Sequence, residues 1–331
     1  MKILIATGIY PPSIGGPALY AQELKNTFVR QGHKVIVKTF SFEKKLPSGL
    51  RHILFFFKSF YAVLVSDMVI ALDTMSVGLP VVILSRLLRK KIVVRIGGDF
   101  LWETYVERTK KDVLLKDFYK DTTLFSFKDK FIFFLTHIVL RWSTKIVFNS
   151  IWQKDLWVSV YGIEPKKVSV IDNFYGKKIS SVAPVKKNFI WATRPLYLKN
   201  GNRLKLAFER ARQINPDIVL EVGTMPRPIL MDCISKCYAV IVPSLTDISP
   251  NLIFDALQYN KPFIVTEETG LPQDIKETGV LVDPLDIKDI EEKILFVAED
   301  RNYERLVVQS RSYNKVHDWD AITREFLALF Y

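Results

Sequence analysis

The sequence predicts an α/β protein built from two doubly wound, parallel-sheet domains. The chain has 331 residues, enough for two domains of about 150 residues each. Short apolar runs alternate with helical patterns along its whole length, which is typical of parallel-sheet architecture. Runs such as Ala239–Val242 are apolar without interruption, as expected for strands buried on both faces of a sheet.

Six strands are expected in the first half of the chain. They lie at Ile3–Thr7, Val35–Phe40, Met68–Leu72, Ile92–Ile96, Ile146–Asn149 and Val168–Ile171. Helical stretches separate them. In the first stretch, Ala21, Leu24 and Phe28 recur at helical spacing before a stop at Gly32. A second helix is expected from Met75 to Arg89.

A second series of strands begins near Asn188. Its members lie at Phe189–Ala192, Ile218–Val222, Ala239–Val242, Phe263–Thr266 and Val280–Val282. The segment 176–187, which contains Ser180, Ser181 and Pro184, is the natural link between the two series, so we predict a first domain at 1–183. Because ligands of doubly wound sheets bind at the carboxyl ends of the strands, functional residues are expected in the loops after them.

The charge of the chain is unevenly distributed. Its net charge is +12, and residues 1–183 hold 28 Lys and Arg against 14 Asp and Glu. This excess predicts that the first half faces something anionic, although charge that merely keeps the protein soluble explains it equally well. A nucleic-acid-binding protein is disfavoured, since no aromatic and basic binding module occurs and the excess is diffuse.

Two glycines, Gly15 and Gly16, stand in the loop after the first expected strand. Pro17 follows them and suits the first turn of a helix. Paired glycines let the backbone approach a ligand closely, and a helix N-terminus favours an anion. A plain tight turn is an equally good interpretation of this loop alone, and the spacing is not that of a dinucleotide-binding fingerprint.

Charged residues lie at and after the carboxyl end of the strand Ile92–Ile96. Arg95, Gly98, Asp99 and Glu103 place an arginine and two carboxylates beside flexible backbone at the expected ligand edge. Acids in surface loops commonly cap helices, but their position here favours a functional role.

Two cations follow the first strand of the second series. Arg194 and Lys199 are five positions apart on one loop, so both can reach a single pyrophosphate and neutralise the charge of a departing diphosphate. Two solvated surface cations are the common alternative.

The segment from Pro243 to Leu257 has the strongest functional pattern. Ser249 suits an N-cap and Pro250 a first helical residue, which leaves the amides of Asn251 and Leu252 exposed for phosphate or sugar oxygens.

Two aspartates belong to the same segment. Asp247 lies just outside the expected helix, within reach of sugar hydroxyls. Asp255 lies inside it, and its side chain tilts toward the helix N-terminus. A carboxylate among apolar residues needs a partner, which ribose hydroxyls or an internal salt bridge would supply.

With these residues the chain resembles, over nearly its full length, the retaining glycosyltransferases of family 4, which have the GT-B fold. Those enzymes have a Gly-Gly loop after their first strand, an Arg and a Lys after the first donor-domain strand, and a Glu-x7-Glu motif. The matching places here are occupied by Gly15 and Gly16, by Arg194 with Lys199, and by Asp247 with Asp255. The resemblance implies that the two cations hold the donor diphosphate, that Asp247 contacts the sugar and that Asp255 contacts the ribose.

The chain departs from the family pattern at three places. Both acids are Asp instead of Glu, and Gly98-Asp99 stands where many members have His-Asp, so Asp99 becomes the candidate for the reacting sugar or acceptor. The short spacing from Lys199 to Pro243 indicates that one β–α unit is missing from the donor domain. The tail Trp319–Tyr331 resembles the family's helix that crosses back onto the first domain. We therefore expect a donor domain at 184–316 and a C-terminal helix at 317–331 packed on the first domain.

The resemblance implies a retaining hexosyltransferase that needs no metal or other cofactor. Its co-substrate would be a UDP- or GDP-type nucleotide sugar, and its acceptor a glycan or lipid-linked molecule of cell-envelope polysaccharide or glycolipid synthesis. Asp318-Trp319-Asp320 spells the metal-binding D-x-D of another glycosyltransferase fold, but it opens the last helix, where Asp is favoured as a cap. The alternatives are a nucleotide-sugar epimerase of the same fold and a non-catalytic basic binding protein.

Two apolar runs, Ile53–Lys58 and Phe131–Leu135, are flanked by Lys and Arg and are too short to span a bilayer. They suit buried helix faces, or else a basic, apolar surface that rests on anionic lipid. The apolar run at the N-terminus is also short, so we expect a cytoplasmic protein, and on the second interpretation a peripheral one on the cytoplasmic face of the membrane.

Overall fold

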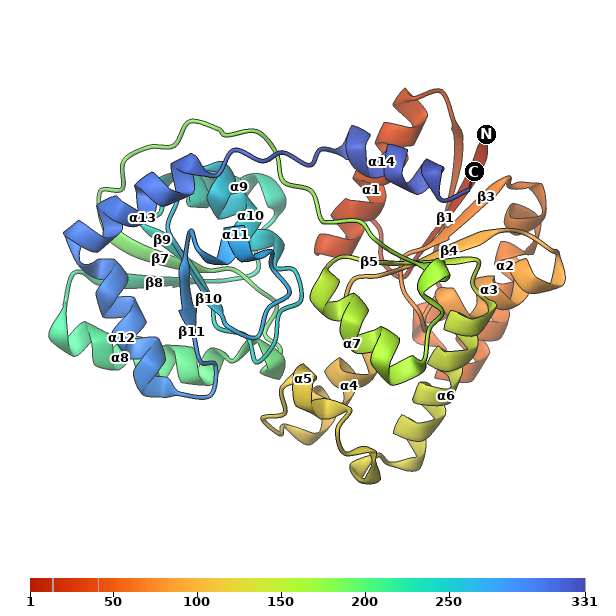
Figure 1. The fold of residues 1–331 in the computed structure, drawn as a ribbon, viewed down its shortest axis with the longest axis horizontal. Helices are drawn as coiled ribbons and strands as arrows, with labels where there is room; N and C mark the ends of the chain where they lie inside the picture. The colour runs from red at the N-terminus through yellow and green to blue at the C-terminus, as the bar shows by residue number, and fades with distance from the viewer. Residues whose placement is uncertain (14, 41, 331) are drawn as a thin grey trace. The chain divides into compact units, whose positions relative to one another are not determined.

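The computed structural model describes residues 1–13, 15–40 and 42–330. Ile14, in the predicted glycine loop, and Tyr331, in the predicted C-terminal helix, lie outside the described residues, as does Ser41. The chain forms two compact units, each with its own parallel sheet (Figure 1). The first unit consists of residues 1–101, 122–172 and 318–331, and the second of residues 102–121 and 173–317.

The first unit is built on a six-stranded parallel sheet in the order β2-β1-β3-β4-β5-β6. The strands are β1 (Lys2–Thr7), β2 (Lys34–Thr39), β3 (Met68–Ala71), β4 (Ile92–Ile96), β5 (Lys145–Phe148) and β6 (Val168–Val170). All six predicted strands are present. The central strands β3 and β4 are buried on both faces of the sheet, whereas β2 and β6 at its edges are only partly buried.

Helices cover both faces of this sheet. They are α1 (Gly16–Arg30), α2 (Ser48–Val65), α3 (Gly78–Leu87), α6 (Phe127–Trp142), α7 (Ile151–Tyr161) and α14 (Trp319–Ala328), with 3₁₀ turns at Phe42–Lys45, Thr122–Leu124 and Pro165–Lys167. The buried sides of α2, α3, α6 and α7 share one core with alternate strand residues.

The C-terminal helix α14 packs on α1 of the first unit, as the resemblance implied. Tyr20 and Trp319 make an edge-to-face contact at 5.1 Å between ring centroids, and Arg30 is 2.8 Å from Asp320. Asp318 caps the helix by accepting a hydrogen bond from the amide of Ala321. The D-x-D tripeptide therefore has the structural role that its place in the sequence predicted.

The second unit has a five-stranded parallel sheet in the order β11-β10-β9-β7-β8. Its strands are β7 (Lys187–Trp191), β8 (Ile218–Val222), β9 (Ala239–Val242), β10 (Phe263–Thr266) and β11 (Val280–Val282). The helices α8 (Gly201–Ile214), α12 (Ile287–Ala298) and α13 (Asp300–Ser312) share one core, and α9 (Arg227–Lys236), α10 (Asn251–Gln258) and α11 (Gln273–Lys276) share another. A 3₁₀ turn at Tyr197–Lys199 precedes α8. Sheets with helices on both faces are the doubly wound architecture that the sequence predicted.

The second unit begins at Asn173, eleven residues before the predicted boundary. The reason is that the linker bonds to this unit: the amide of Ile179 donates to Gln258 and that of Val182 to Ser235. Lys178 donates to the carbonyls of Leu257 and Ser310, and burial lowers its pKa to about 8.

A stretch from the first half of the chain also belongs to the second unit. It comprises most of α4 (Phe100–Thr109) together with α5 (Leu115–Phe118). The sequence did not indicate this. Among the described residues, no helix combines the length and the apolar composition that a bilayer crossing requires.

Candidate active site

Three loops meet at the carboxyl edge of the second sheet. They follow β7, β9 and β10, and the loop after β11 is bonded to them. Asn200 has a left-handed backbone conformation, and its side-chain Nδ2 donates to Pro243 O (2.9 Å) and Pro284 O (2.6 Å). The amide of Leu245 donates to Leu198 O at 2.9 Å, and that of Asp247 to Glu268 O at 3.0 Å. These bonds hold the predicted functional loops in one place, where ligands of such sheets bind.

Lys199 and Asp247 face each other within these loops. The Lys199 ammonium is 2.6 Å from Asp247 Oδ2, and the two side chains are 20% and 15% exposed. Ser244 Oγ donates to the same carboxylate oxygen at 3.3 Å, and Thr269 Oγ1 donates to the Asp247 carbonyl at 2.7 Å. The structure thus brings together two predicted site residues as a half-buried ion pair, whose cation can bind an arriving anion.

Arg194 differs from Lys199 in its surroundings. Its side chain is exposed, and within the part of the chain that the structure describes its guanidinium makes no ion pair or side-chain hydrogen bond. It can therefore turn toward a phosphate without first breaking a contact.

The helix α10 begins one residue later than predicted. Pro250 occupies the N-cap position, so Ser249 is not the cap. The Ser249 hydroxyl accepts a hydrogen bond from another residue instead. Asn173 Nδ2 donates to Ser249 Oγ at 2.9 Å and to Asn251 Oδ1 at 3.0 Å. Asn251 is exposed and Leu252 half-buried, so the start of the helix still presents amides that an anion can approach.

Asp255 is buried and forms an ion pair with Arg227, the first residue of α9. Arg227 donates through two nitrogens, at 2.5 Å and 2.6 Å, to the two carboxylate oxygens. Burial raises the pKa of Asp255, while Arg227 acts to lower it. Asp255 therefore has the internal salt bridge that the sequence left open as one of its two partners. The sequence pattern did not identify Arg227, because in the second series of strands the candidate residues all lay in the loops after β7 and β9. Arg227 follows β8 at the same edge of the sheet.

The segment 102–121 binds to the same loops of the second unit. Arg203 makes two hydrogen bonds with Asp112, at 3.1 Å and 2.5 Å, and Tyr197 OH donates to Asp112 at 2.9 Å. The amide of Leu115 donates to Thr246 Oγ1 at 3.1 Å. Next to it, Lys116 pairs with the buried carboxylate of Glu268. This segment holds the loops after β7, β9 and β10 against one another. Glu103 belongs to it too, in the first turn of α4.

The glycine loop of the first unit has the predicted form. Gly15 precedes α1 with φ = 148°, a backbone conformation that residues with a side chain rarely adopt. Its carbonyl accepts hydrogen bonds from the amides of Ala18 and Leu19. Pro17 lies in the first turn of the helix.

Arg95, within β4, and Asp99, after it, are more buried than expected, whereas Glu103 is half-buried. The Arg95 guanidinium lies 3.8 Å from the centroid of the Tyr20 ring, and Gly98 O accepts from Gln153 Nε2 at 3.0 Å. Asp99 is 1% exposed, and its Oδ2 accepts from the indole of Trp157 at 3.0 Å. We correct the expectation for Asp99 to this extent: its carboxylate faces the interior of the unit and does not face solvent.

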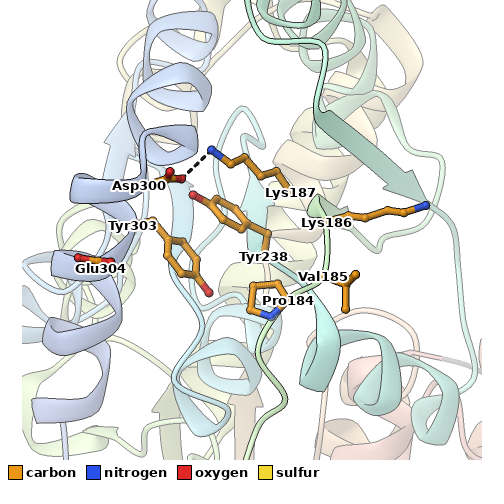
Figure 2. Close-up of a pocket in the computed structure, with 8 residues that line it drawn as sticks. All are labelled: Pro184, Val185, Lys186, Lys187, Tyr238, Asp300, Tyr303 and Glu304. Carbon is orange, nitrogen blue, oxygen red and sulfur yellow. Dashed lines mark hydrogen bonds and ion pairs between the residues drawn. The ribbon is translucent and has the colours of Figure 1, made fainter.

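The second unit also has a hollow, whose lining residues include Lys187, Tyr238 and Tyr303 (Figure 2). It has a volume of about 340 Å³ and lies at the amino ends of β7 and β9, where Tyr238 stacks on Tyr303 at 4.0 Å and Lys187 pairs with Asp300. Since ligands of doubly wound sheets bind at the carboxyl ends, we do not assign the activity to this hollow. Within residues 1–13, 15–40 and 42–330, no group of three or more His, Cys, Asp or Glu is placed to hold a metal ion.

Comparison with known proteins bears on the second unit most directly. Residues 194–300 match the family model described as Glycosyl transferases group 1. No curated protein matches the sequence. The matched residues contain Arg194, Lys199, Asp247 and Asp255, so the match covers the loops described above.

Solved structures match the whole chain. HepE from Anabaena in complex with UDP and glucose is 14% identical with a TM-score of 0.70, covering 99% of this chain and 98% of that one. Sucrose-phosphate synthase from Thermosynechococcus elongatus is 13% identical with a TM-score of 0.73 over the same shares. The lipopolysaccharide outer core galactosyltransferase WaaB, in its apo form, is 16% identical with a TM-score of 0.63, over 99% of each chain. The chain therefore has the predicted GT-B fold, and residues 194–300 of its second unit are similar to glycosyl transferases group 1.

Proposed function

We propose that the protein is a glycosyltransferase that transfers a sugar from a UDP-type donor, with retention of configuration and without a metal ion. The observation that carries this proposal is the Lys199–Asp247 pair at the carboxyl edge of the second sheet, inside the segment that matches glycosyl transferases group 1. The choice of UDP is supported by the complexes of HepE with UDP, UDP and glucose, and UDP-glucose.

In the proposed mechanism, Lys199 and Arg194 bind the donor diphosphate. When the donor binds, its phosphate oxygens replace Asp247 as the partner of the Lys199 ammonium. The Asp247 carboxylate can then accept hydrogen bonds from sugar hydroxyls. The bond between the anomeric carbon and the diphosphate oxygen then breaks, and the two cations stabilise the negative charge that develops on the diphosphate. Amides at the start of α10 add to this stabilisation.

The acceptor hydroxyl attacks from the face that the diphosphate leaves, because the sequence identifies no convincing enzymatic nucleophile. Its oxygen bonds to the anomeric carbon, and its proton passes to the departing diphosphate oxygen. Asp99 touches neither substrate in this proposal. As a positioning residue it fixes Trp157, and the loop after β4, with Arg95, Gly98 and Glu103 near it in sequence, serves the acceptor. We propose a glycan or lipid-linked acceptor of the cell envelope, met at the cytoplasmic face of the membrane.

A panel of UDP- and GDP-sugars, incubated with and without candidate acceptors, tests the proposed function. We expect one UDP-sugar to be consumed, with product formed on an acceptor or slow hydrolysis without one. In Lys199→Ala turnover should fall roughly 100-fold to 1,000-fold, the usual effect of removing one donor that stabilises transition-state charge. Lys205→Ala, on an exposed lysine of α8, is the matched control and should keep full activity.

Two outcomes would contradict the proposal. Near-normal turnover in Lys199→Ala would remove the diphosphate assignment. Conversion of a UDP-sugar to its epimer without an acceptor would instead assign the site to a nucleotide-sugar epimerase.

A further inference from the structure

The helix α2 exposes an apolar stripe on its solvent side. Its exposed members recur three, four or seven positions apart: Leu50, Ile53, Leu54, Phe57, Phe60, Tyr61 and Leu64. Phe57 is 67% and Tyr61 71% exposed. The opposite side of the same helix, with Phe55 and Val63, is buried in the core of the first unit. A surface helix normally turns polar residues to water, so α2 is apolar on the side where it should be polar.

The helix α6 also exposes apolar residues on its solvent side. Phe127, Phe131, Phe134 and Trp142 are exposed on its outer side, Phe127 to 88%. Ile132, Thr136, Val139 and Leu140 face the core instead. Single exposed apolar residues need no explanation, but a contiguous apolar stripe along a helix marks a surface that binds something. The helix α3 contacts both α2 and α6.

The two stripes belong to one layer of the first unit. The buried sides of α2, α3 and α6 pack on the same face of the sheet, and Figure 1 shows these helices together on the side away from α1 and α14. Because their inner sides face one sheet, their outer sides point the same way. We call the exposed residues of α2 and α6 named above the aromatic face.

The charges of the same helices are almost all positive. Together, α2, α3 and α6 contain six Lys and Arg: Arg51, Lys58, Arg86, Lys128, Lys130 and Arg141. Lys58 pairs with the buried Glu43, whereas Arg86, Lys128, Lys130 and Arg141 are exposed. The one acid of these three helices, Asp129, is buried in a capping box with Ser126 at the start of α6. A partner of the aromatic face must therefore accept phenylalanine side chains and carry negative charge. An anionic lipid bilayer has both properties, because its acyl region lies directly beneath its charged headgroups.

We propose that the aromatic face docks the protein on an anionic lipid bilayer. The axes of α2 and α6 lie along the membrane plane, their phenylalanines enter the boundary between headgroups and acyl chains, and the exposed lysines and arginines bind lipid phosphates. The proposal deepens the proposed function by naming the surface on which the enzyme meets a lipid-linked acceptor. Vesicle binding and donor hydrolysis are measured separately, so either can fail alone.

The experiment is sedimentation of the full-length protein with vesicles. One set contains phosphatidylglycerol and phosphatidylcholine in equal parts, the other phosphatidylcholine alone. We expect binding to the mixed vesicles that weakens as salt is raised. Phe57→Ser with Phe134→Ser should weaken it by roughly tenfold or more for each ring removed. Ile214→Ser with Val308→Ser, which change residues 66% and 63% exposed on the second unit, are the matched control and should bind as wild type.

Charge reversal gives an independent arm. Lys128→Glu with Lys130→Glu should lower affinity for the mixed vesicles at least roughly tenfold, since each basic residue near an anionic surface contributes about fivefold. Lys205→Glu with Arg210→Glu makes the same charge change on α8 and should have a much smaller effect. All of these variants should hydrolyse the donor in solution at the wild-type rate.

Equal sedimentation with and without mixed vesicles would overturn the proposal, as would unchanged binding by the phenylalanine variant. A concentration-dependent dimer that is lost in Phe57→Ser with Phe134→Ser, without vesicle binding by wild type, would assign the face to a second copy of the chain and would also overturn it.

Discussion

The ion pair between Arg227 and Asp255 allows a prediction whose size follows from burial. Arg227→Met would leave the Asp255 carboxylate without a partner while its side chain is 7% exposed. Breaking a fully buried pair costs about 3–5 kcal/mol, whereas exposed pairs contribute about 0.2–1 kcal/mol. The Arg227 side chain is 36% exposed, so water reaches one end of the pair. We therefore expect the free energy of unfolding of Arg227→Met to fall by about 3 kcal/mol at neutral pH.

The loss should depend on pH with a definite sign. Burial raises the pKa of Asp255 above its ordinary value, and Arg227 opposes that effect. Without Arg227 the folded-state pKa rises further. A carboxyl with a raised folded-state pKa contributes stability below its unfolded-state pKa and loses it as pH rises through the folded-state value. The deficit of Arg227→Met should therefore shrink as the pH is lowered toward the ordinary range of a carboxyl.

Urea unfolding of four proteins, followed by circular dichroism, measures this prediction. The variants are Arg227→Met, Asp255→Leu and the double variant, beside wild type. The double variant should recover most of the stability lost in Arg227→Met, because no buried charge is left unpaired. The reasoning is refuted if Arg227→Met unfolds at the wild-type urea concentration, or if the double variant is as unstable as the sum of the single ones.

Three further predictions concern packing, capping and the site. In Gly279→Ala the new Cβ would lie 2.1 Å from Cε2 of the buried Phe263 ring, so the free energy of unfolding in urea should fall by roughly 2 kcal/mol, whereas Gly49→Ala, with open space around it, should lose nothing. Asp318→Ala removes the cap of α14 and should cost about 1 kcal/mol, seen as faster hydrogen exchange in that helix; unchanged exchange would count against the capping assignment. Asp247→Asn frees Lys199 from its ion pair, so it should bind UDP at least as tightly as wild type while turnover falls roughly tenfold or more; weaker UDP binding would contradict the competition that we propose.

The strands could be predicted because their signal is local. Each contains a short run of apolar, often β-branched residues, and in β3, β4, β9 and β10 that run is buried along its whole length. The paired glycines at the start of α1 and the aspartate cap of α14 were predictable for the same reason, since a turn or a cap is decided within a few residues.

The contacts that define the site could be predicted only in part. Lys199 and Asp247 each follow a strand of one parallel sheet. Because the carboxyl ends of these strands lie at the same edge, the two residues could be predicted to lie close together. Arg227 and Asp255 are 28 positions apart, and nothing in the local pattern of either residue identifies the other. Likewise, the burial of Asp99 depends on Trp157, which reaches it from another helix. The domain boundary was misplaced because backbone bonds from the linker leave no trace in composition.

The binding of UDP to wild type, Lys199→Ala and Lys205→Ala, measured by titration calorimetry, tests the central claim most directly. The claim is that Lys199 holds the diphosphate of the donor. Because a hydrogen bond to a charged group contributes about 1.5–3 kcal/mol, Lys199→Ala should bind UDP roughly tenfold to 100-fold more weakly, and Lys205→Ala should bind it as wild type does. Equal UDP affinity in wild type and Lys199→Ala, with both proteins folded, would contradict the claim.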